Sequence, residues 1–134
     1  MTGEVDLKKL IQGMRPELNQ GEYVYCLMDS KEHAKELDPL CYFHEKEGVT
    51  VILPKEKADL LSLPYDAICA WITLTVHSSL EAVGLTAAVS NTLTEANISC
   101  NIVAAFHHDH IFTPVKDARR AMDTLHKLAS AGSE

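Results

Sequence analysis

Residues 70–114 have the sequence AWITLTVHSSLEAVGLTAAVSNTLTEANISCNIVAAFHHDHIFTP, and this stretch decides the fold. Residues 70–76 are rich in β-branched and aromatic side chains, which predicts a strand. After a loop that contains one glycine, apolar residues recur at helical spacing over 85–96. Apolar residues then alternate with period two over 98–106, and a further strand resumes at 111–113. The predicted order is therefore strand, helix, strand, strand.

This order of elements is compatible with few sheets. A right-handed crossover places the third strand between the first two, which gives a split βαβ unit and an α+β, ferredoxin-like fold. We expect antiparallel sheets with the helices on one face. The apolar run Tyr65–Val76 is longer than the usual strand of about 5–6 residues, so it could end one unit and begin the next.

The rest of the chain repeats the pattern of a strand, a hairpin and a helix. The sequence predicts a helix over 7–14, a strand over 22–28, a short helical segment over 30–37, a hairpin of 41–45 with 49–53, a helix over 55–61 and an amphipathic helix over 115–129. We interpret this pattern as a duplication, βαββαβ in each copy, with a degenerate half over residues 1–66 and a second half over 67–134. The second half lacks a final strand, so pairing within the chain or between chains must cover its sheet edge.

Part of the chain also resembles a known family. The stretches that carry the resemblance are VHSSLEAVGLTAAV at 76–89, ISCNIVA at 98–104 and HDHIF at 108–112. They are similar to the ACT domain, in particular to the branch found in aspartokinase regulatory regions and cytosolic amino-acid sensors. The clear match covers roughly the C-terminal half, and the N-terminal half looks like the weaker ACT-like partner that often precedes it. The resemblance implies a tandem, regulatory protein that binds a free amino acid and pairs with another copy.

The charge of the chain restricts its partners. The formal net charge is −7, which argues against nucleic acid and against an anionic membrane surface. Residues 1–66 carry 8 basic and 13 acidic side chains, and residues 67–134 carry 4 and 6. Between Ala67 and Phe106 the only formal charges are Glu81 and Glu95. That window is therefore either a core or an interface, and we expect a homodimer.

Cysteine usage and hydropathy indicate the compartment. Cys26, Cys41, Cys69 and Cys100 follow no CxxC spacing, and each falls in a strand-like segment, which favours buried, reduced thiols. No apolar run approaches the roughly 18–20 residues of a membrane span. The N-terminus has no basic region typical of a signal peptide. We expect a cytoplasmic protein without a cofactor.

The loop 78–85 is the candidate ligand site. Free N–H groups at the start of the following helix attract carboxylates, and Gly84 lets a ligand approach the backbone closely. Glu81 could meet a ligand ammonium group. The alternative is that Ser78 or Ser79 only organises the turn and that Gly84 only fits a tight bend. The resemblance favours the ligand site.

The resemblance also maps ligand contacts onto particular residues of this chain. These residues are Ser78, Ser79, Glu81, Val83, Gly84, Leu85, Asn101 and Ile102. Strand alternation places Asn101 on the face opposite Ile102. Asn101 would therefore reach a pocket only if its face of the sheet meets another part of the protein.

The sequence HHDH at 107–110 suggests a second kind of site, because clustered imidazoles and a carboxylate are typical transition-metal ligands. In the predicted sheet, His108 and His110 share one face near the end of the strand that leads to His77. The alternative is a solvated hairpin tip, and the spacing is not one of the strong zinc patterns. We expect no metal, and a site of His77, His108 and His110 is the alternative.

The aromatic residues of the predicted strands are expected in the core. These residues are Tyr23, Tyr25, Phe43 and Trp71. Asn97 is expected to end its helix in the left-handed conformation.

The sequence lacks the common signatures of catalytic sites. There is no G-x-S-x-G elbow, phosphate-binding loop or dinucleotide-binding signature. We therefore expect a non-catalytic protein. The resemblance to the ACT domain implies that it is a regulatory or sensor protein that binds a free amino acid or a similar small zwitterion and acts on an unidentified protein partner. A metal-binding protein and a purely structural dimerisation module are the alternatives.

Overall fold

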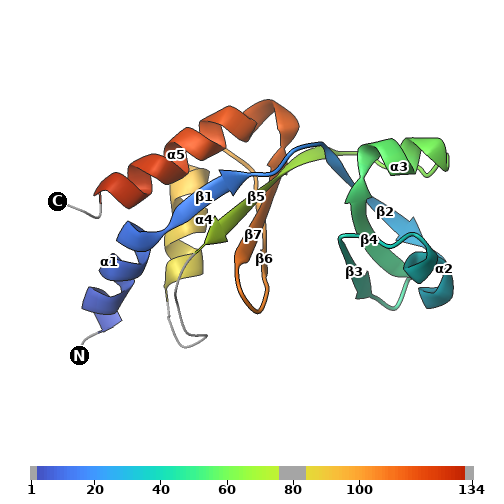
Figure 1. Ribbon diagram of the computed structural model, residues 1–134, viewed down its shortest axis with the longest axis horizontal. Helices are drawn as coiled ribbons and strands as arrows, with labels where there is room; N and C mark the ends of the chain where they lie inside the picture. Colours follow the sequence, from blue (N-terminus) through green and yellow to red (C-terminus); the bar gives the residue numbers. More distant parts are fainter. Residues whose placement is uncertain (1–2, 76–83, 132–134) are drawn as a thin grey trace. The chain divides into compact units, whose positions relative to one another are not determined.

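The structure is a computed structural model that describes residues 3–75 and 84–131 (Figure 1). Its elements are α1 (Gly3–Gly13), β1 (Arg15–Leu18), β2 (Tyr23–Met28), α2 (Lys31–Glu36), β3 (Cys41–His44), β4 (Val49–Pro54), α3 (Lys55–Leu60), β5 (Ile68–Thr75), α4 (Leu85–Glu95), β6 (Asn101–Ala104), β7 (Asp109–Pro114), the 3₁₀ turn η1 (Val115–Asp117) and α5 (Ala118–Ala131). The chain forms two compact units. Unit 1 comprises Met1–Asn19 with Trp71–Glu134, and unit 2 comprises Gln20–Ala70.

Unit 2 is a ferredoxin-like unit in which the strands have the order β3-β4-β2-β5 (Figure 1). All of its strand pairs are antiparallel, and β4 lies between β2 and β3, as the crossover argument predicts. The short helices α2 and α3 bury Ala34 and Ala58 against one face of this sheet. The buried core consists of Val24, Cys26, Met28, Ala34, Leu37, Val49, Val51, Leu53 and Ala58.

Unit 1 has the same strand arrangement, but its fourth strand comes from the N-terminal end of the chain. Its strands have the order β6-β7-β5, and β1 pairs with β5 (Figure 1). The β1–β5 pair is antiparallel and runs from Arg15 opposite Thr75 to Leu18 opposite Ile72. The final strand that the second half lacks in sequence is therefore supplied from within the chain.

Strand β1 is short and lies at the edge of the sheet of unit 1. Pro16 is tolerated there because a proline cannot donate a ladder hydrogen bond and is confined to edges. The residue after the strand fixes its position. The Asn19 backbone N–H donates to Trp71 O at 2.9 Å, and its side chain donates to Thr73 Oγ1, also at 2.9 Å.

Strand β5 contributes to both units, as the length of the apolar run predicts. Ile68 and Cys69 pair with β2 in unit 2, whereas Ile72 to Thr75 pair with β1 in unit 1. The division of the sequence repeat at residues 66/67 stays a prediction.

The core of unit 1 includes part of the uncharged window between Ala67 and Phe106. Strands β5 and β7 and helices α4 and α5 contribute side chains to one cluster, to which α1 adds Leu7 and Ile11. The buried members are Met14, Ile72, Leu74, Leu85, Val89, Leu93, Ile98, Ile111, Ala121 and Leu125. Burial in a core therefore accounts for six residues of the window, whereas other described residues of it, such as Thr86, Asn91 and Phe106, are exposed.

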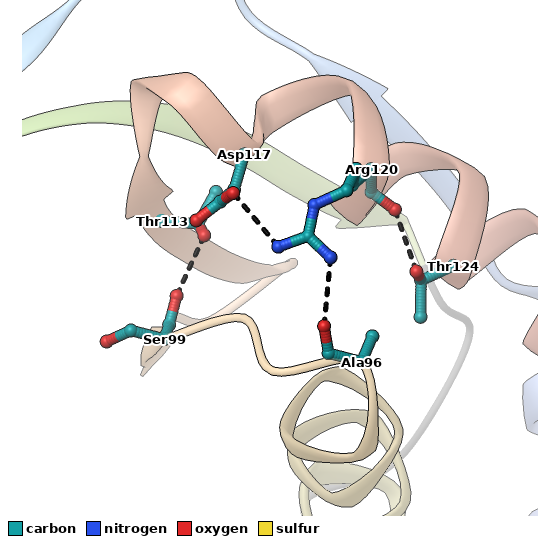
Figure 2. A network of polar contacts seen from close by, with 6 residues as sticks. All are labelled: Ala96, Ser99, Thr113, Asp117, Arg120 and Thr124. Carbon is teal, nitrogen blue, oxygen red and sulfur yellow. Dashed lines mark hydrogen bonds and ion pairs between the residues drawn. The ribbon is translucent and has the colours of Figure 1, made fainter.

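A polar network fixes the C-terminal end of α4 against the start of α5 (Figure 2). The Arg120 guanidinium donates to Ala96 O at 2.9 Å and to Asp117 Oδ1 at 3.0 Å, so a cation lies at the negative end of the α4 dipole. Thr113, which is fully buried, donates from its hydroxyl to Ser99 O at 2.8 Å. Asn97 has a φ of 60°, which confirms the left-handed residue at the end of the helix.

The expectation for the aromatic residues is wrong at Phe43, which is 70% exposed. Tyr23, Tyr25 and Trp71 are only partly buried. Phe43 lies opposite Thr50, on the face of the sheet that α2 and α3 do not cover. The period-two pattern identifies two faces of a strand but not which face meets a helix.

The four cysteines are free thiols, with Cys26 and Cys69 buried and Cys41 and Cys100 partly buried. Within residues 3–75 and 84–131, no helix is both long and apolar enough to cross a membrane.

Candidate ligand site at the start of helix α4

Gly84 forms the N-terminal cap of α4 and has a left-handed backbone, with φ 98° and ψ −14°. Its carbonyl accepts the Ala88 N–H at 2.8 Å, which begins the helical hydrogen bonding. A glycine has no side chain that could accept from the first N–H groups of the helix, and within Leu85–Glu95 no acidic residue lies in the first turn. The positive end of the α4 dipole is therefore not neutralised by its own first residues, which suits a ligand carboxylate.

The corresponding strand-to-helix connection of unit 2 is different. Ser30 caps α2 with an extended backbone, and its hydroxyl accepts the His33 N–H at 3.1 Å. Asp29 lies 3.4 Å from the His33 ring at the same helix start. In unit 2, the side chain of Ser30 therefore accepts a backbone N–H at the start of α2. In unit 1, the residue at the corresponding position before α4 is a glycine, Gly84.

Helix α1 approaches the candidate site. A Cβ atom built on Gly84 would lie 3.2 Å from Leu7 Cδ2, which is tighter than ordinary van der Waals contact. The left-handed φ independently disfavours any residue with a side chain. Gly84 is thus required by the fold of unit 1, whether or not a ligand approaches it.

The structure describes half of the residues that the resemblance maps to the ligand. Ser78, Ser79, Glu81 and Val83 lie outside the described residues. Leu85 is 3% exposed, and Ile102 packs against the same core, so both side chains serve the core of unit 1.

Asn101 is exposed and lies on the face of β6 opposite Ile102, as strand alternation predicts. It pairs with Phe112 at the end of the unit where α4 finishes, whereas Gly84 lies where α4 begins. The 11 residues of α4 are about 16 Å long. A ligand site that includes both Gly84 and Asn101 stays a prediction.

His110 takes part in a cluster of side-chain contacts that the sequence did not predict. The Trp71 indole N–H donates to His110 Nδ1 at 3.0 Å, and Thr73 Oγ1 lies 3.3 Å from the same atom. Trp71 also stacks on Phe112, with ring centroids 6.5 Å apart. Trp71 and Thr73 alternate with the core residue Ile72, so this group lies on the other face of β5. The alternation of apolar and hydroxyl residues in β5 was the signal for this second face.

The hydrogen bond from the Trp71 indole determines the tautomer of the His110 imidazole. An indole N–H can only donate, so His110 Nδ1 must carry a lone pair, and the neutral ring has its proton on Nε2. Burial lowers the pKa of His110, and the charge of His108 lowers it further, while Asp109 opposes both. His108 Nδ1 is buried and finds no hydrogen-bond partner among the described residues.

The lowered pKa of His110 predicts a pH-dependent signal from Trp71, the single tryptophan of the chain. The contribution of the neutral ring to stability is present above the ordinary histidine pKa of about 6.5 and is lost as the pH falls through the lowered value. Burial raises the pKa of Asp109, which therefore acts with the opposite sign in the carboxyl range. We expect Trp71 fluorescence to change with a midpoint below about 6.5, together with the NMR titration of His110.

Two substitutions control this measurement. His110→Gln offers an amide oxygen that accepts at every pH, so the fluorescence curve should become flat over this range. His126→Gln removes an exposed histidine of α5 and should leave the curve unchanged. A midpoint at or above the ordinary histidine value, or an unchanged curve in His110→Gln, would contradict the assignment.

The described histidines do not form a metal site. Across the described part of the chain, no three His, Cys, Asp or Glu side chains lie where they could hold a metal ion. The ring centroids of His108 and His110 are 6.3 Å apart, and His77 lies outside the described residues. The metal site that includes His77 stays a prediction.

Unit 2 has an open cavity of about 430 Å³ at the start of α3, lined by Gly21, Glu22, Pro54, Lys55, Glu56 and Asp59. Asp59 accepts from Lys55 Nζ at 2.8 Å and from Tyr65 Oη at 2.6 Å, and these bonds hold its pKa below the usual value. Since Lys55 is paired and two further carboxylates line the cavity, it does not suit an anionic ligand.

Comparison with known proteins agrees with this architecture. Two sequence models of the ACT domain match the chain, over residues 2–70 and 66–127. The chain therefore belongs to the ACT domain family. No match was found among curated proteins.

Solved structures show the same fold. A protein of unknown function from Vibrio cholerae, a possible transport protein, is 43% identical, with a TM-score of 0.88 over 96% of this chain and 99% of its own. The ligand-free regulatory subunit of aspartate kinase from Thermus thermophilus is 10% identical, with a TM-score of 0.62 over 89% of this chain and 97% of its own. The aspartate kinase of Clostridium acetobutylicum is 9% identical, with a TM-score of 0.64 over 87% of this chain and 34% of its own.

Proposed function

We propose that this protein is a non-catalytic regulatory ACT protein that binds a small ligand with a carboxylate, a free amino acid, at the start of helix α4. The observation that carries this proposal is the difference between the two units at the same strand-to-helix connection. Ser30 caps the helix of unit 2 with its hydroxyl, whereas the N-cap residue of α4 in unit 1 is Gly84, which has no side chain to make a cap hydrogen bond. Membership of the ACT family supports a regulatory, ligand-binding role.

The proposed mechanism is thermodynamic linkage. A ligand that binds one arrangement of the protein more tightly shifts the population toward that arrangement. The Thermus chain is a regulatory subunit, and the Clostridium enzyme is allosteric, which fits such a role for this fold. Here the output would pass to a separate protein partner, and a cytoplasmic location is part of the same proposal.

A thermal-shift screen against the common amino acids tests the proposal. A ligand that binds only the folded state stabilises it by RT ln(1 + [L]/Kd), so a true ligand raises Tm progressively with its concentration. If no amino acid raises Tm at millimolar concentration, the amino-acid proposal is wrong.

Thr86→Glu is expected to weaken binding while stabilising the free protein. Thr86 is exposed in the first turn of α4, so a carboxylate there complements the helix dipole and adds about 0.3–1 kcal/mol. The same charge repels a ligand carboxylate, and we expect affinity to fall about tenfold or more. Calorimetric titration with the amino acid found in the screen, together with Tm of the free protein, measures both effects.

Asn91→Glu is the matched control, because Asn91 is exposed in the middle of the same helix. It adds the same charge away from the helix start and should leave the affinity within about twofold. Equal weakening by both substitutions would show a general charge effect and would remove the ligand from the start of α4.

The proposed role of Glu81 as partner of the ligand ammonium group has its own control. Glu81 and Glu95 are the only charges between Ala67 and Phe106, and Glu95 ends α4. Glu81→Gln should weaken binding, whereas Glu95→Gln should not. Unchanged binding in Glu81→Gln would end the ammonium role.

A further inference from the structure

Both places where the chain passes between the two units belong to one group of hydrogen bonds in unit 1. The chain leaves unit 1 after Asn19 and returns to it at Trp71. The Asn19 backbone N–H donates to Trp71 O at 2.9 Å, so the two ends of the segment 20–70 are joined directly. The Asn19 side chain donates to Thr73 Oγ1, and the Trp71 indole N–H donates to His110 Nδ1. We call Asn19, Trp71, Thr73 and His110 the junction cluster.

One nitrogen atom of the junction cluster has two polar neighbours. His110 Nδ1 lies 3.0 Å from the Trp71 indole nitrogen and 3.3 Å from Thr73 Oγ1. In the neutral ring the single lone pair of Nδ1 accepts the indole N–H, which leaves no second lone pair for the Thr73 hydroxyl. The partner of His110 Nδ1 therefore depends on whether this atom carries a lone pair or a proton.

Protonation of His110 reverses the role of Nδ1. Both nitrogens of an imidazolium are donors, so the new N–H faces the Trp71 indole N–H, which can only donate. The Thr73 hydroxyl oxygen can accept it instead, because a hydroxyl has two lone pairs and Asn19 uses one of them. The imidazolium gains no contact with the face of the indole, because Trp71 presents its N–H edge to His110.

Few charged groups act on His110 from the strands of unit 1. Strands β5 and β6 carry no charged residue, and His110 pairs with Val103 on β6. The charged or titratable neighbours are His108 and Asp109 at the start of β7, and Arg15 and Glu17 on β1, which pair with Thr75 and Thr73. Burial and the charge of His108 lower the pKa of His110, and Asp109 opposes them. The two charges of β1 are opposite in sign and exposed, so solvent screens them.

We propose that the junction cluster is a proton-operated switch, in which protonation of His110 moves Nδ1 from Trp71 to Thr73, releases the indole and loosens the pairing of β1 with β5 where the chain passes to unit 2. The end of β1 depends on this cluster, because β1 is an edge strand of four residues that contains Pro16. The switch needs no ligand at α4, so it goes beyond the proposed function and each can fail alone.

The direction of the switch follows from the neutral ring. The indole bond is fully present above the ordinary histidine pKa of about 6.5. It is lost as the pH falls through the lowered pKa of His110, so acid opens the junction cluster.

An NMR titration of His110 tests the exchange of partners. Thr73→Val keeps the shape of the side chain but removes the acceptor for the imidazolium, so the midpoint of His110 should fall by about one pH unit. Asn19 keeps a partner in this variant, because its side chain also donates to Trp71 O at 3.2 Å. Thr75→Val, the same change two residues further along β5, is the matched control and should leave the midpoint within about 0.3 unit. An unchanged or raised midpoint in Thr73→Val would overturn the exchange.

Hydrogen exchange of the Trp71 indole N–H tests its release. The comparison is with His110→Gln at the same pH, because an amide oxygen accepts at every pH and the intrinsic pH dependence of exchange cancels. About two units above the His110 midpoint, both proteins should exchange this proton at similar rates. About one unit below the midpoint, the native chain should exchange it at least about fivefold faster. Equal rates on both sides of the midpoint would overturn the release of the indole.

Backbone hydrogen exchange distinguishes the switch from general unfolding in acid. The Asn19 N–H reports on the junction, and the Ile98 N–H, which donates to Leu93 O at 2.9 Å, reports on the end of α4 in the same unit. Below the midpoint, protection of Asn19 should fall at least about fivefold relative to Ile98 in the native chain but not in His110→Gln. An equal loss at both amides would mean that unit 1 unfolds as a whole, and it would overturn the switch.

Discussion

Replacing Met14 by alanine is expected to lower the free energy of unfolding of unit 1 by about 2–5 kcal/mol, the usual cost of truncating a large buried side chain. Met14 is 1% exposed and belongs to the same core as Ile72 and Leu125. It lies between α1 and β1, so its side chain ties the N-terminal segment into a unit whose other residues begin at Trp71. Denaturant unfolding followed by Trp71 fluorescence measures the effect.

Met14→Leu is the control for this experiment. It keeps an apolar side chain of similar volume, so the loss should stay below about 1.5 kcal/mol. If Met14→Ala unfolds with the midpoint of the native protein, the N-terminal segment contributes little to unit 1, and the assignment of β1 as its fourth strand would be wrong.

Gly84→Leu is expected to lower stability by about 1–3 kcal/mol even without ligand. The backbone of Gly84 has φ 98°, which residues with a side chain rarely adopt, and a Cβ there would meet Leu7 at 3.2 Å. Thermal and denaturant unfolding of the free protein measure the loss. This substitution does not give a clean test of ligand binding, because folding and binding fail together, so Thr86→Glu is the better test.

Gly13→Ala is the matched control for the glycine substitution. Gly13 is the last residue of α1, and a Cβ built on it would meet nothing within 4 Å. The stability of the Gly13→Ala variant should stay close to that of the native chain or rise slightly, because alanine reduces the conformational entropy of the unfolded chain. A loss in Gly13→Ala as large as that in Gly84→Leu would mean that the backbone and the Leu7 contact are not the cause.

The sequence was sufficient to predict the fold class, because hydrophobic periodicity and turn residues are local signals. Asn97 and the hairpin around Gly48 show this, since each combines a regular pattern with a residue that accepts a positive φ. The fourth strand of unit 1 could not be predicted in the same way. The sequence Arg15–Leu18 is short, polar and contains Pro16, and only its pairing with β5 makes it a strand. Propensity was overridden there by tertiary context.

The candidate site was predicted only in part, for a related reason. Gly84 could be recognised from the sequence because a glycine often marks a backbone with positive φ or a close contact with another part of the chain. In the structure Gly84 has both a positive φ and a close contact with Leu7. The contact of Trp71 with His110 joins residues far apart in sequence, and alternation alone does not say which residues of neighbouring strands lie opposite each other. Phe43 was misplaced because the period-two pattern does not show which face of a strand meets a helix.

The interrupted order of unit 1 has a consequence for how the chain reaches its native state. Strand β1 is synthesised before all of unit 2, but the part of β5 with which it pairs, Ile72 to Thr75, follows residues 20–70. The β1–β5 contact must therefore close a long loop, at an entropic cost that grows as about (3/2)RT ln n. Unit 2 is continuous in sequence and can form first. Its own pairing of Tyr23 with Cys69 then holds the two ends of the insertion side by side, only a few residues from Leu18 and Ile72. Most of the closure entropy is thereby lost before unit 1 assembles, so destabilising unit 2 should slow the folding of unit 1 without any change in the contacts of unit 1 itself.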